Sequence, residues 1–240
     1  MESPYQIVKE RLLTILRTEH FENNKLYSEE ELVRILDASR STVREALRSL
    51  ENDGIISKKH GVGTFVHPKV LAMNMRFDQN LDFMKMIEDE GYQAGLLRDG
   101  DPQIGPCPQD ILEGVGRFLN QEEEYYSFRR LYTADGKPAA YCTMYFPNRA
   151  FHALPPGQVE FVNIFGFTEK YFQRATDHEL ISFSARCAEG IMAQKLQVEP
   201  GTALLVWDEL LCDYQDNVLG FSRIYFTPSM ASLSILRQTK

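Results

Sequence analysis

Arginine and hydroxyl side chains gather at the start of one amphipathic segment, residues 39–54, with the sequence SRSTVREALRSLENDG. Arginine can donate two hydrogen bonds to guanine, and serine or threonine can bond a phosphate or a base edge. The apolar residues of the segment recur at helical spacing, which leaves the polar ones a face of their own. An arginine-rich amphipathic helix alone is more often a solvated surface, so the surrounding elements must decide whether this one binds nucleic acid.

Catalytic and metal-binding side-chain sets do not emerge from the sequence. It contains no GxSxG, no HExxH and no phosphate-binding loop. His152 and His178 stand alone along the chain. Asp208 and Glu209 are adjacent in a strand-like stretch and would point to opposite faces, so we expect one to be solvated and the other to be locally paired. We therefore expect no catalytic residue, no bound metal and no cofactor.

The composition is that of a globular cytoplasmic protein. Hydrophobic residues make up 43% and charged residues 25%, enough for a packed core. No apolar run approaches the roughly 20 residues of a membrane helix, and the N-terminus does not resemble a signal peptide. The cysteines are dispersed without a CxxC pair, which predicts reduced packing residues. They are Cys107, Cys142, Cys187 and Cys212.

Charge is distributed unevenly around a formal net charge of −8. Residues 1–67 carry 10 basic and 11 acidic side chains, whereas the remainder carries 16 and 23. Residues 19–37 hold 2 basic and 6 acidic side chains, and residues 39–60 hold 5 and 3. One locally basic surface thus lies on an acidic body, so we expect modest non-specific affinity for polyanions.

Three helices and a hairpin are predicted over the first 67 residues. Residues 4–18 have helical apolar spacing. Ser28 and Glu31 have the spacing of a capping box at the start of a second helix that ends near residue 36. Ser39 is a plausible N-cap of the third helix, and Gly54 stands where a left-handed C-terminal residue belongs.

Strand-like residues on both sides of a glycine-containing turn, HGVG, then predict a small β-hairpin. Together these elements form a winged helix-turn-helix. In that fold the third helix enters the major groove with its N-terminal turn leading, and the hairpin tip approaches the backbone or the minor groove. The predicted DNA-binding residues are Ser28, Arg40, Ser41, Thr42, Arg44, Lys58, Lys59, Gly61, Gly63 and Thr64.

This region resembles the N-terminal domain of GntR-family transcription regulators. The resemblance is carried by YSEEEL, by SRSTVREALRSLENDGII and by GVGTFV, and covers nearly all of residues 5–67. It implies DNA contacts from Arg40, Thr42, Arg44 and the tip of the wing. One departure concerns Glu30, which stands where the family usually has an arginine. The departure implies that one DNA contact is lost and that the operator differs from the commonest type.

The remaining chain mixes helical and strand-like segments. Asp135-Gly136 is a strong hairpin turn signal between two strand-like runs. We expect an α+β domain with an antiparallel sheet. The expected helices cover residues 81–91, 109–119, 163–174 and 185–196, a loop covers 98–108, and the expected strands cover 125–133, 139–146, 202–214 and 218–226.

Residues 77–236 resemble the UTRA effector-binding domain of the HutC-type subgroup, through FRRLYTADGKPAAYCTMYFP, AEGIMAQKLQVEPGTALLVWDELLCDY and GFSRIYF. The resemblance implies a fold similar to chorismate lyase. Many such domains bind a phosphosugar through two hairpin arginines and a hydroxyl at a helix N-terminus. Here Arg130 matches the first arginine, Tyr132 replaces the second, Asp82 replaces the hydroxyl residue, and the place of a late acidic residue falls near Gly220.

These replacements predict a different ligand. A carboxylate at position 82 would repel a phosphate dianion, and loss of an arginine removes a bidentate partner. We hypothesise a less charged or amine-bearing metabolite, although Asp82 is as readily explained as an N-cap. Arg223 can line the pocket or, as we favour, pair with a surface carboxylate. The candidate effector-binding residues are Asp82, Arg130, Tyr132, Arg223 and Tyr225.

The combined hypothesis is a homodimeric transcription regulator, more plausibly a repressor, that binds a palindromic DNA operator and a small-molecule effector. Residues 1–67 would bind DNA, 68–80 would be a linker, and 81–240 would bind effector and dimerise. Two alternatives stay open: an enzyme of chorismate-lyase-like fold with an appended DNA-binding domain, and a constitutive DNA-binding protein without an effector.

Overall fold

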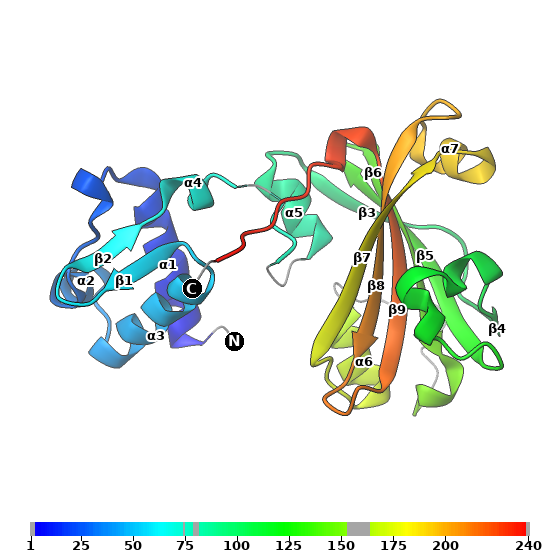
Figure 1. The fold of residues 1–240 in the computed structure, drawn as a ribbon, viewed down its shortest axis with the longest axis horizontal. Coiled ribbons are helices and arrows are strands. Elements are labelled where there is room, and N and C mark those ends of the chain that lie inside the picture. The colour runs from blue at the N-terminus through cyan, green and yellow to red at the C-terminus, as the bar shows by residue number, and fades with distance from the viewer. Residues whose placement is uncertain (1–2, 74, 79–81, 153–163, 239–240) are drawn as a thin grey trace. The chain divides into compact units, whose positions relative to one another are not determined.

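The computed structural model describes residues 3–73, 75–78, 82–152 and 164–238. The chain divides into two compact units, Met1–Asn80 with Ser234–Lys240, and Leu81–Leu233 (Figure 1). The C-terminal residues therefore group with the first unit, whereas the sequence analysis assigned them to the second. Among the described helices, none is long and apolar enough to cross a membrane.

The first unit is the predicted winged helix-turn-helix. A buried cluster joins the three helices and the hairpin; it includes Leu12, Leu32, Leu47, Leu50 and Val66. The short α4 lies in the stretch expected to be a linker, of which residues 74, 79 and 80 fall outside the described residues. The elements are α1 (Pro4–Thr18), η1 (Glu22–Asn24), α2 (Glu29–Leu36), α3 (Arg40–Asn52), β1 (Ile56–Lys59), β2 (Gly63–Val66) and α4 (Pro68–Leu71).

The predicted helix caps are present in the first unit. The Ser28 hydroxyl accepts a hydrogen bond from the Glu31 amide, while the Glu31 carboxylate accepts one from the Ser28 amide, so the capping box is complete. Ser39 caps α3 by accepting from the Thr42 amide. Gly54 follows α3 with φ +69°, a left-handed conformation that favours glycine. These caps fix where the helices of the DNA-binding fold begin and end.

The C-terminal segment adds a short pairing to the first unit. The Ser234 amide donates to the Met75 carbonyl at 2.9 Å, and the Phe77 amide donates to the Ser234 carbonyl at 3.0 Å. Between these residues, Arg76 is buried and bonds both the Asp78 carboxylate and the Asp53 carbonyl just after α3. Two segments far apart in sequence thus meet next to the C-terminal end of α3.

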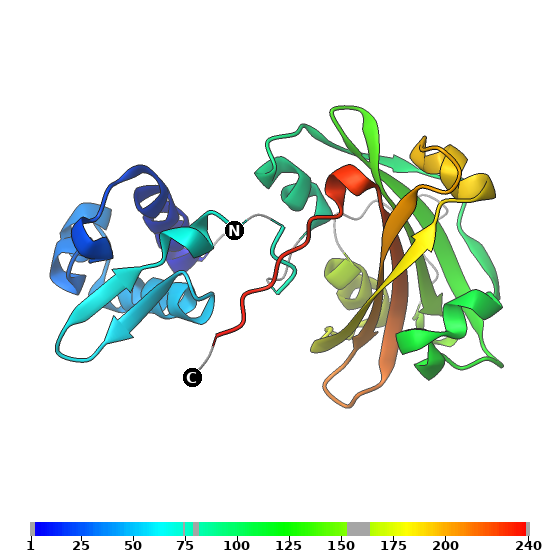
Figure 2. The same cartoon turned by 45° about the horizontal axis from the view of Figure 1, so that its top comes forward.

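The second unit is built on a strongly twisted, antiparallel seven-stranded sheet (Figures 1 and 2). Its order is β3-β5-β6-β9-β8-β7, and β4 also pairs with β5. The β5–β6 turn has positive φ at Asp135 and Gly136, as predicted. The strands are β3 (Ala94–Arg98), β4 (Gln103–Pro106), β5 (Glu124–Ala134), β6 (Lys137–Pro147), β7 (His178–Cys187), β8 (Ala203–Cys212) and β9 (Val218–Phe226).

Helices cover both faces of this sheet. Phe83 of α5 (Phe83–Asp89) and Phe167 of α6 (Ile164–Phe172) contact aromatic rings of one face, which we call the aromatic face. The opposite face packs on η2 (Gln109–Leu112), η3 (Gly114–Phe118) and α7 (Gly190–Leu196). Two more short 3-10 turns, η4 (Asn148–Ala150) and η5 (Pro228–Met230), follow β6 and β9. Because strand side chains alternate, neighbouring residues are divided between the two faces.

Three sequence expectations for the second unit were wrong. Residues 109–119 form two 3-10 helices instead of one α-helix, because Gly114 has φ +57° and a Cβ on Gly116 would collide with the Ile111 carbonyl. The expected loop at 98–108 includes β4. The helix expected at 185–196 begins only at Gly190, because residues 185–187 continue β7. Position 163, the first residue of the helix expected at 163–174, lies outside the described residues.

Arg223 forms the main buried ion pair of the face opposite the aromatic face. Its guanidinium donates two hydrogen bonds to Asp208, at 2.6 and 2.7 Å, and the two side chains are 2% and 8% exposed. Asp110, 53% exposed, is a second partner at 3.2 Å. The expectation that Arg223 pairs with a surface carboxylate holds for Asp110, but its main partner, Asp208, is buried. The expectation that one of Asp208 and Glu209 is solvated is wrong, because both are buried.

We expect Asp208→Ala to destabilise the second unit by about 3–5 kcal/mol, because it leaves a buried guanidinium without its bidentate partner. Asp110→Ala is the matched control: it removes an exposed carboxylate from the same arginine and should cost about 1 kcal/mol or less. Urea unfolding of both variants measures the difference. Equal losses for the two variants would contradict the importance assigned to the buried pair.

Candidate functional site

The first turn of α3 presents the predicted base-reading side chains to solvent. Arg40, Ser41 and Arg44 are exposed, and Thr42 is half-buried. The Ser39 hydroxyl lies 2.8 Å from the hydroxyls of both Ser41 and Thr42, so the cap also orders these side chains. The other side of the helix is buried in the core, as its apolar spacing predicts. The turn is therefore free to enter a groove.

Acidic residues of α2 form ion pairs with three basic side chains of this surface. Arg44 Nε lies 2.7 Å from Glu29 Oε2, and Lys58 Nζ lies 3.4 Å from Glu29 Oε1. Arg40 pairs with Glu30 at 3.2 Å. The hydrogen bond from Arg44 opposes the desolvation of Glu29 and holds the pKa of that carboxyl below its usual value. A DNA phosphate or base must replace these carboxylates to engage the cations.

The wing lies beside this surface. Lys59 is exposed at the end of β1, and Gly61 has φ +73°, a conformation that favours glycine at the turn. Gly63 has φ +137°, and a Cβ there would lie 2.9 Å from the Lys25 side chain. Thr64 accepts a backbone hydrogen bond from Leu26, which joins the wing to the strand-like segment before α2. Lys25, in that segment, is thus a basic residue beside the wing that sequence reasoning did not select.

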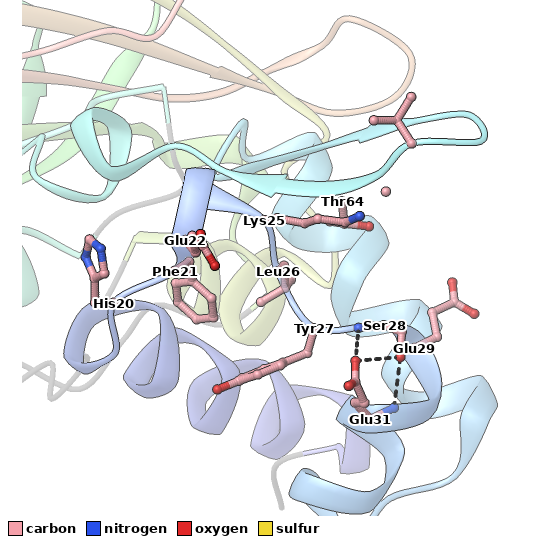
Figure 3. Close-up of a pocket in the computed structure, with 12 residues that line it drawn as sticks. His20, Phe21, Glu22, Lys25, Leu26, Tyr27, Ser28, Glu29, Glu31 and Thr64 are labelled. Carbon is pink, nitrogen blue, oxygen red and sulfur yellow. Dashed lines mark hydrogen bonds between the residues drawn. The ribbon is translucent and has the colours of Figure 1, made fainter.

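A hollow of about 720 Å³ separates the wing from the start of α2 (Figure 3). Ser28 and Glu29 line one side, Gly63 and Thr64 line the other, and Lys25 also lines it. The hollow therefore brings together predicted residues from α2 and from the wing, with the backbone N–H groups of a helix N-terminus at its edge. The lining also includes the carboxylates of Glu22, Glu29 and Glu31, which oppose the approach of a phosphate backbone.

Three of the five candidate effector residues are brought together on the aromatic face. Arg130 is 4% exposed, its Cζ lies 5.3 Å from the centre of the Phe128 ring, and it hydrogen-bonds Tyr132. Burial raises the pKa of Tyr132 above its usual value. Asp82 caps α5 by accepting from the Met84 amide, and Phe83 packs edge-to-face on Tyr132. Phe83 therefore covers this part of the face.

A buried carboxyl group on β8, Glu209, and a half-buried one on β7, Glu179, form a pair on the same face. Glu209 is 7% exposed, accepts a hydrogen bond from Ser222 at 2.8 Å, and hydrogen-bonds Glu179. Burial, followed by the nearby Glu179, raises the pKa of Glu209 well above its usual range. Burial raises the pKa of Glu179 as well. The aromatic face thus combines a buried guanidinium, Arg130, and the exposed Arg98 opposite it with an acidic pair that sequence reasoning did not select.

The other two candidate effector residues lie elsewhere. Arg223 and Tyr225 alternate with Ser222 and Ile224 along β9, so their side chains belong to the face opposite Arg130. Arg223 is engaged by Asp208, and Tyr225 packs in the cluster around α7. The five residues therefore do not form one site.

Comparison with known proteins agrees with both units. Residues 4–66 match the family described as bacterial regulatory proteins, gntR family, and residues 116–232 match the UTRA domain. The chain belongs to the GntR family, in the HutC-type subgroup. It is a ligand-responsive, DNA-binding transcription regulator, with a GntR helix-turn-helix domain followed by a UTRA effector-binding domain.

Individual relatives are distant. The chain is 21% identical over 202 residues to the HTH-type transcriptional regulator GgaR of Escherichia coli K12, which covers 83% of this chain and 76% of the relative. It is 39% identical over 66 residues to the arabinose metabolism transcriptional repressor of Halalkalibacterium halodurans, 27% of this chain and 18% of the relative. The possible transcriptional regulator YydK of Bacillus subtilis has a similar fold, with a TM-score of 0.72 at 18% identity over 100% of both chains.

The ion pairs between the acidic residues of α2 and the basic residues of the DNA-binding surface could have been anticipated only in part. The charge counts placed an acidic segment directly before a basic one, and Glu30 was noted as a departure from the family pattern. Neither observation shows that Glu30 pairs with Arg40 or that Glu29 pairs with both Arg44 and Lys58. Those contacts depend on how α2 and α3 pack.

Glu29→Gln and Glu30→Gln should each increase affinity for DNA roughly two- to fivefold, the range expected from releasing an exposed ion pair. Non-specific DNA should gain at least as much as a specific site, because each change also removes a negative charge near the phosphates. Fluorescence anisotropy with scrambled duplex at several salt concentrations measures the effect. Glu10→Gln on α1 is the control, since it changes net charge equally at an exposed carboxylate outside the described ion pairs. A gain equal to that of the control would contradict a direct role for the pairs.

Proposed function

We propose that this GntR-family regulator is a repressor whose α3 N-terminal turn reads an operator. The observation that supports this most is the exposed row of Arg40, Ser41 and Arg44 beside the wing, opposite the buried side of the helix. A repressor role agrees with the name of the arabinose metabolism transcriptional repressor of Halalkalibacterium halodurans, to which the chain is 39% identical over 66 residues. Residues 1–67 are the proposed DNA-binding domain.

The proposed active form is a homodimer on a palindromic operator. A single α3 spans only a few base pairs, whereas two-fold related helices read two half-sites and double the contacts. We assign dimer contacts and effector binding to the chain from residue 81 onward, and the linker to residues 68–80. The protein would act in the cytoplasm, where the DNA is.

The proposed effector is less charged than a sugar phosphate, or bears an amine. The aromatic face offers the buried guanidinium of Arg130, with the exposed Arg98 opposite it on β3, against the carboxyl groups of Asp82, Glu179 and Glu209. Such a face favours a cationic or neutral polar group and disfavours a phosphate dianion. An ammonium group near Glu209 would also stabilise the ionised carboxyl, whose burial is otherwise unfavourable. Tyr132 and Arg130 would then orient the rest of the molecule.

Phe83 gives this effector site a route to the DNA-binding unit. Its ring lies 5.5 Å from the centres of both the Tyr132 and Trp207 rings, so a ligand that reaches Tyr132 must displace it. Phe83 begins the first helix after the linker, and displacement would therefore pull on the linker. Any such coupling is reciprocal: operator DNA must weaken effector binding by the same factor.

Catalysis is not part of the proposed function. The rival hypothesis of an enzyme with a chorismate-lyase-like fold would require substrate turnover by the isolated protein. The other rival, a constitutive DNA-binding protein, would have one DNA affinity whatever metabolite is added. The acidic pair on the aromatic face supports an effector site, because a buried carboxyl group with a second carboxyl beside it is unfavourable in an unliganded core.

The DNA-binding prediction is tested with DNA from upstream of the gene and with a genomic-fragment library. We expect saturable binding to a palindrome, and Arg40→Ala and Arg44→Ala should each weaken it about fivefold or more, since a bidentate arginine–guanine contact contributes about 1–3 kcal/mol. Arg17→Ala on α1 removes the same charge from another exposed position and should leave specificity unchanged. If no fragment is bound more tightly than scrambled DNA, the regulator hypothesis fails for this chain.

The effector prediction is tested by thermal shift with matched panels of amine-bearing metabolites and sugar phosphates. We expect at least one amine-bearing compound to raise Tm and to weaken operator binding, and we expect Glu209→Gln to abolish both effects. Glu122→Gln, on an exposed turn, is the control and should retain them. A strong shift with a sugar phosphate, kept in Glu209→Gln, would overturn the assignment of the acidic pair.

A further inference from the structure

Strand pairing brings three different donor side chains together at one end of the sheet, away from the aromatic face. His178, the first residue of β7, is directly opposite Cys212, the last residue of β8. Paired residues of antiparallel strands place their side chains on the same face. Asp216 follows in the β8–β9 turn, and one ligand atom from each of these three residues lies within 4.8 Å of the other two.

The imidazole of His178 is held between two carboxylates. Its Nε2 lies 3.1 Å from Asp216 Oδ1, inside the cluster. Its Nδ1 lies 3.2 Å from Asp177 Oδ2, on the outer side. A metal-binding histidine characteristically donates its second ring N–H to a carboxylate, which fixes the tautomer that leaves the other nitrogen free for the metal. Asp177 is placed to act in this way on His178.

The turn that carries Asp216 is fixed in place by Asp213. The Asp213 carboxylate accepts hydrogen bonds from the amides of Gln215 and Asn217 and from the Asn217 side chain. Asp216 itself has φ +63°, a conformation that an aspartate adopts more readily than most residues. The turn therefore presents the Asp216 carboxylate toward His178 in a defined position.

The cluster is open to solvent on one side, because its three side chains differ in how exposed they are. Cys212 is 2% exposed, whereas the side chains of His178 and Asp216 are 40% and 81% exposed. An ion could therefore arrive through the exposed pair and meet the thiol behind it. This differs from an acidic surface cluster, because the donors are sulfur, nitrogen and oxygen and one of them is interior.

We propose that His178, Cys212 and Asp216 bind a divalent cation of the zinc class, with water in the fourth position and Asp177 as a positioning residue. In a tetrahedral zinc site, with bonds of about 2.0–2.2 Å to nitrogen and oxygen, those two donors lie about 3.4 Å apart. The 3.1 Å between Nε2 and Asp216 Oδ1 is near that separation. A thiolate and an imidazole favour zinc over calcium or magnesium.

Binding requires only a proton transfer. The Cys212 thiol loses its proton to buffer as the S–metal bond forms, and no electron is exchanged. The cation would link the start of β7 to the β8–β9 turn, so we expect it to stabilise the second unit. The alternative is an imidazole that merely bridges Asp177 and Asp216, with no role for the thiol.

The untagged full-length chain, reduced and treated with chelator, is titrated with Co²⁺ and then with Zn²⁺. We expect a near-ultraviolet thiolate-to-cobalt charge-transfer band at one equivalent, its loss when Zn²⁺ is added, and a higher Tm with Zn²⁺. Cys212→Ser should abolish the band, and Cys187→Ser, at an exposed cysteine, should retain it. Asp177→Asn should weaken Zn²⁺ binding about 10- to 100-fold, as loss of an outer carboxylate does.

Asp216→Asn provides a check that does not depend on folding, since this side chain is exposed. It should lower Zn²⁺ affinity with an unchanged circular dichroism spectrum. Absence of the charge-transfer band in the wild-type chain, or its persistence in Cys212→Ser, would overturn the site. So would Zn²⁺ affinity unchanged by Asp216→Asn. None of these readouts depends on DNA or effector, so the result is independent of the proposed function.

Discussion

The hydrogen-bond register of the seven-stranded sheet determines which side chains of the second unit can act together. Arg130 and Glu209 lie on the same face of the sheet. Residues paired across neighbouring strands share a face, as do residues two positions apart along one strand, and these two rules connect Arg130 on β5 with Glu209 on β8. The same register places Arg223, Asp208 and Cys212 on the other face. A slip of one residue would exchange the two sets. Which side chains can act together in this unit therefore depends more on strand pairing than on closeness in the sequence.

Burial then gives each face a different electrostatic character. On the face with Arg223, the guanidinium and Asp208 satisfy each other, and the pair is structural. On the aromatic face, burial disfavours ionisation of both Glu209 and the half-buried Glu179, and the nearby Glu179 further disfavours ionisation of Glu209. A buried acidic pair is unfavourable unless it is protonated or meets a cation. The unfavourable burial of carboxyl groups is thus found on the face that also carries Phe83 and Tyr132, where the proposed effector would bind.

Local signals in the sequence predicted most of the elements, because caps, turn residues and apolar periodicity act over a few positions. Ser28, Ser39 and Asp135-Gly136 marked their boundaries correctly. Residues 109–119 were predicted as one α-helix because their spacing is helical, but Gly116 packs too closely on Ile111 for a regular helix. The DNA-binding residues in the first turn of α3 could be predicted from their residue types and their order in the sequence. The pairing of His178 with Cys212 was not, since it depends on a strand register set by contacts distant in sequence.

Acidic residues beside a DNA-reading helix are easily taken as a defect of the surface, yet they keep binding to DNA weak wherever no base contacts are gained. Non-specific and specific binding both require Glu29 and Glu30 to release Arg44 and Arg40. Only at a specific site do the released arginines gain base contacts in return. The carboxylates also repel phosphates at every sequence. The ion pairs and carboxylates therefore lower affinity for every sequence, and only an operator offsets this loss through base contacts, so a protein with net charge −8 can still select an operator.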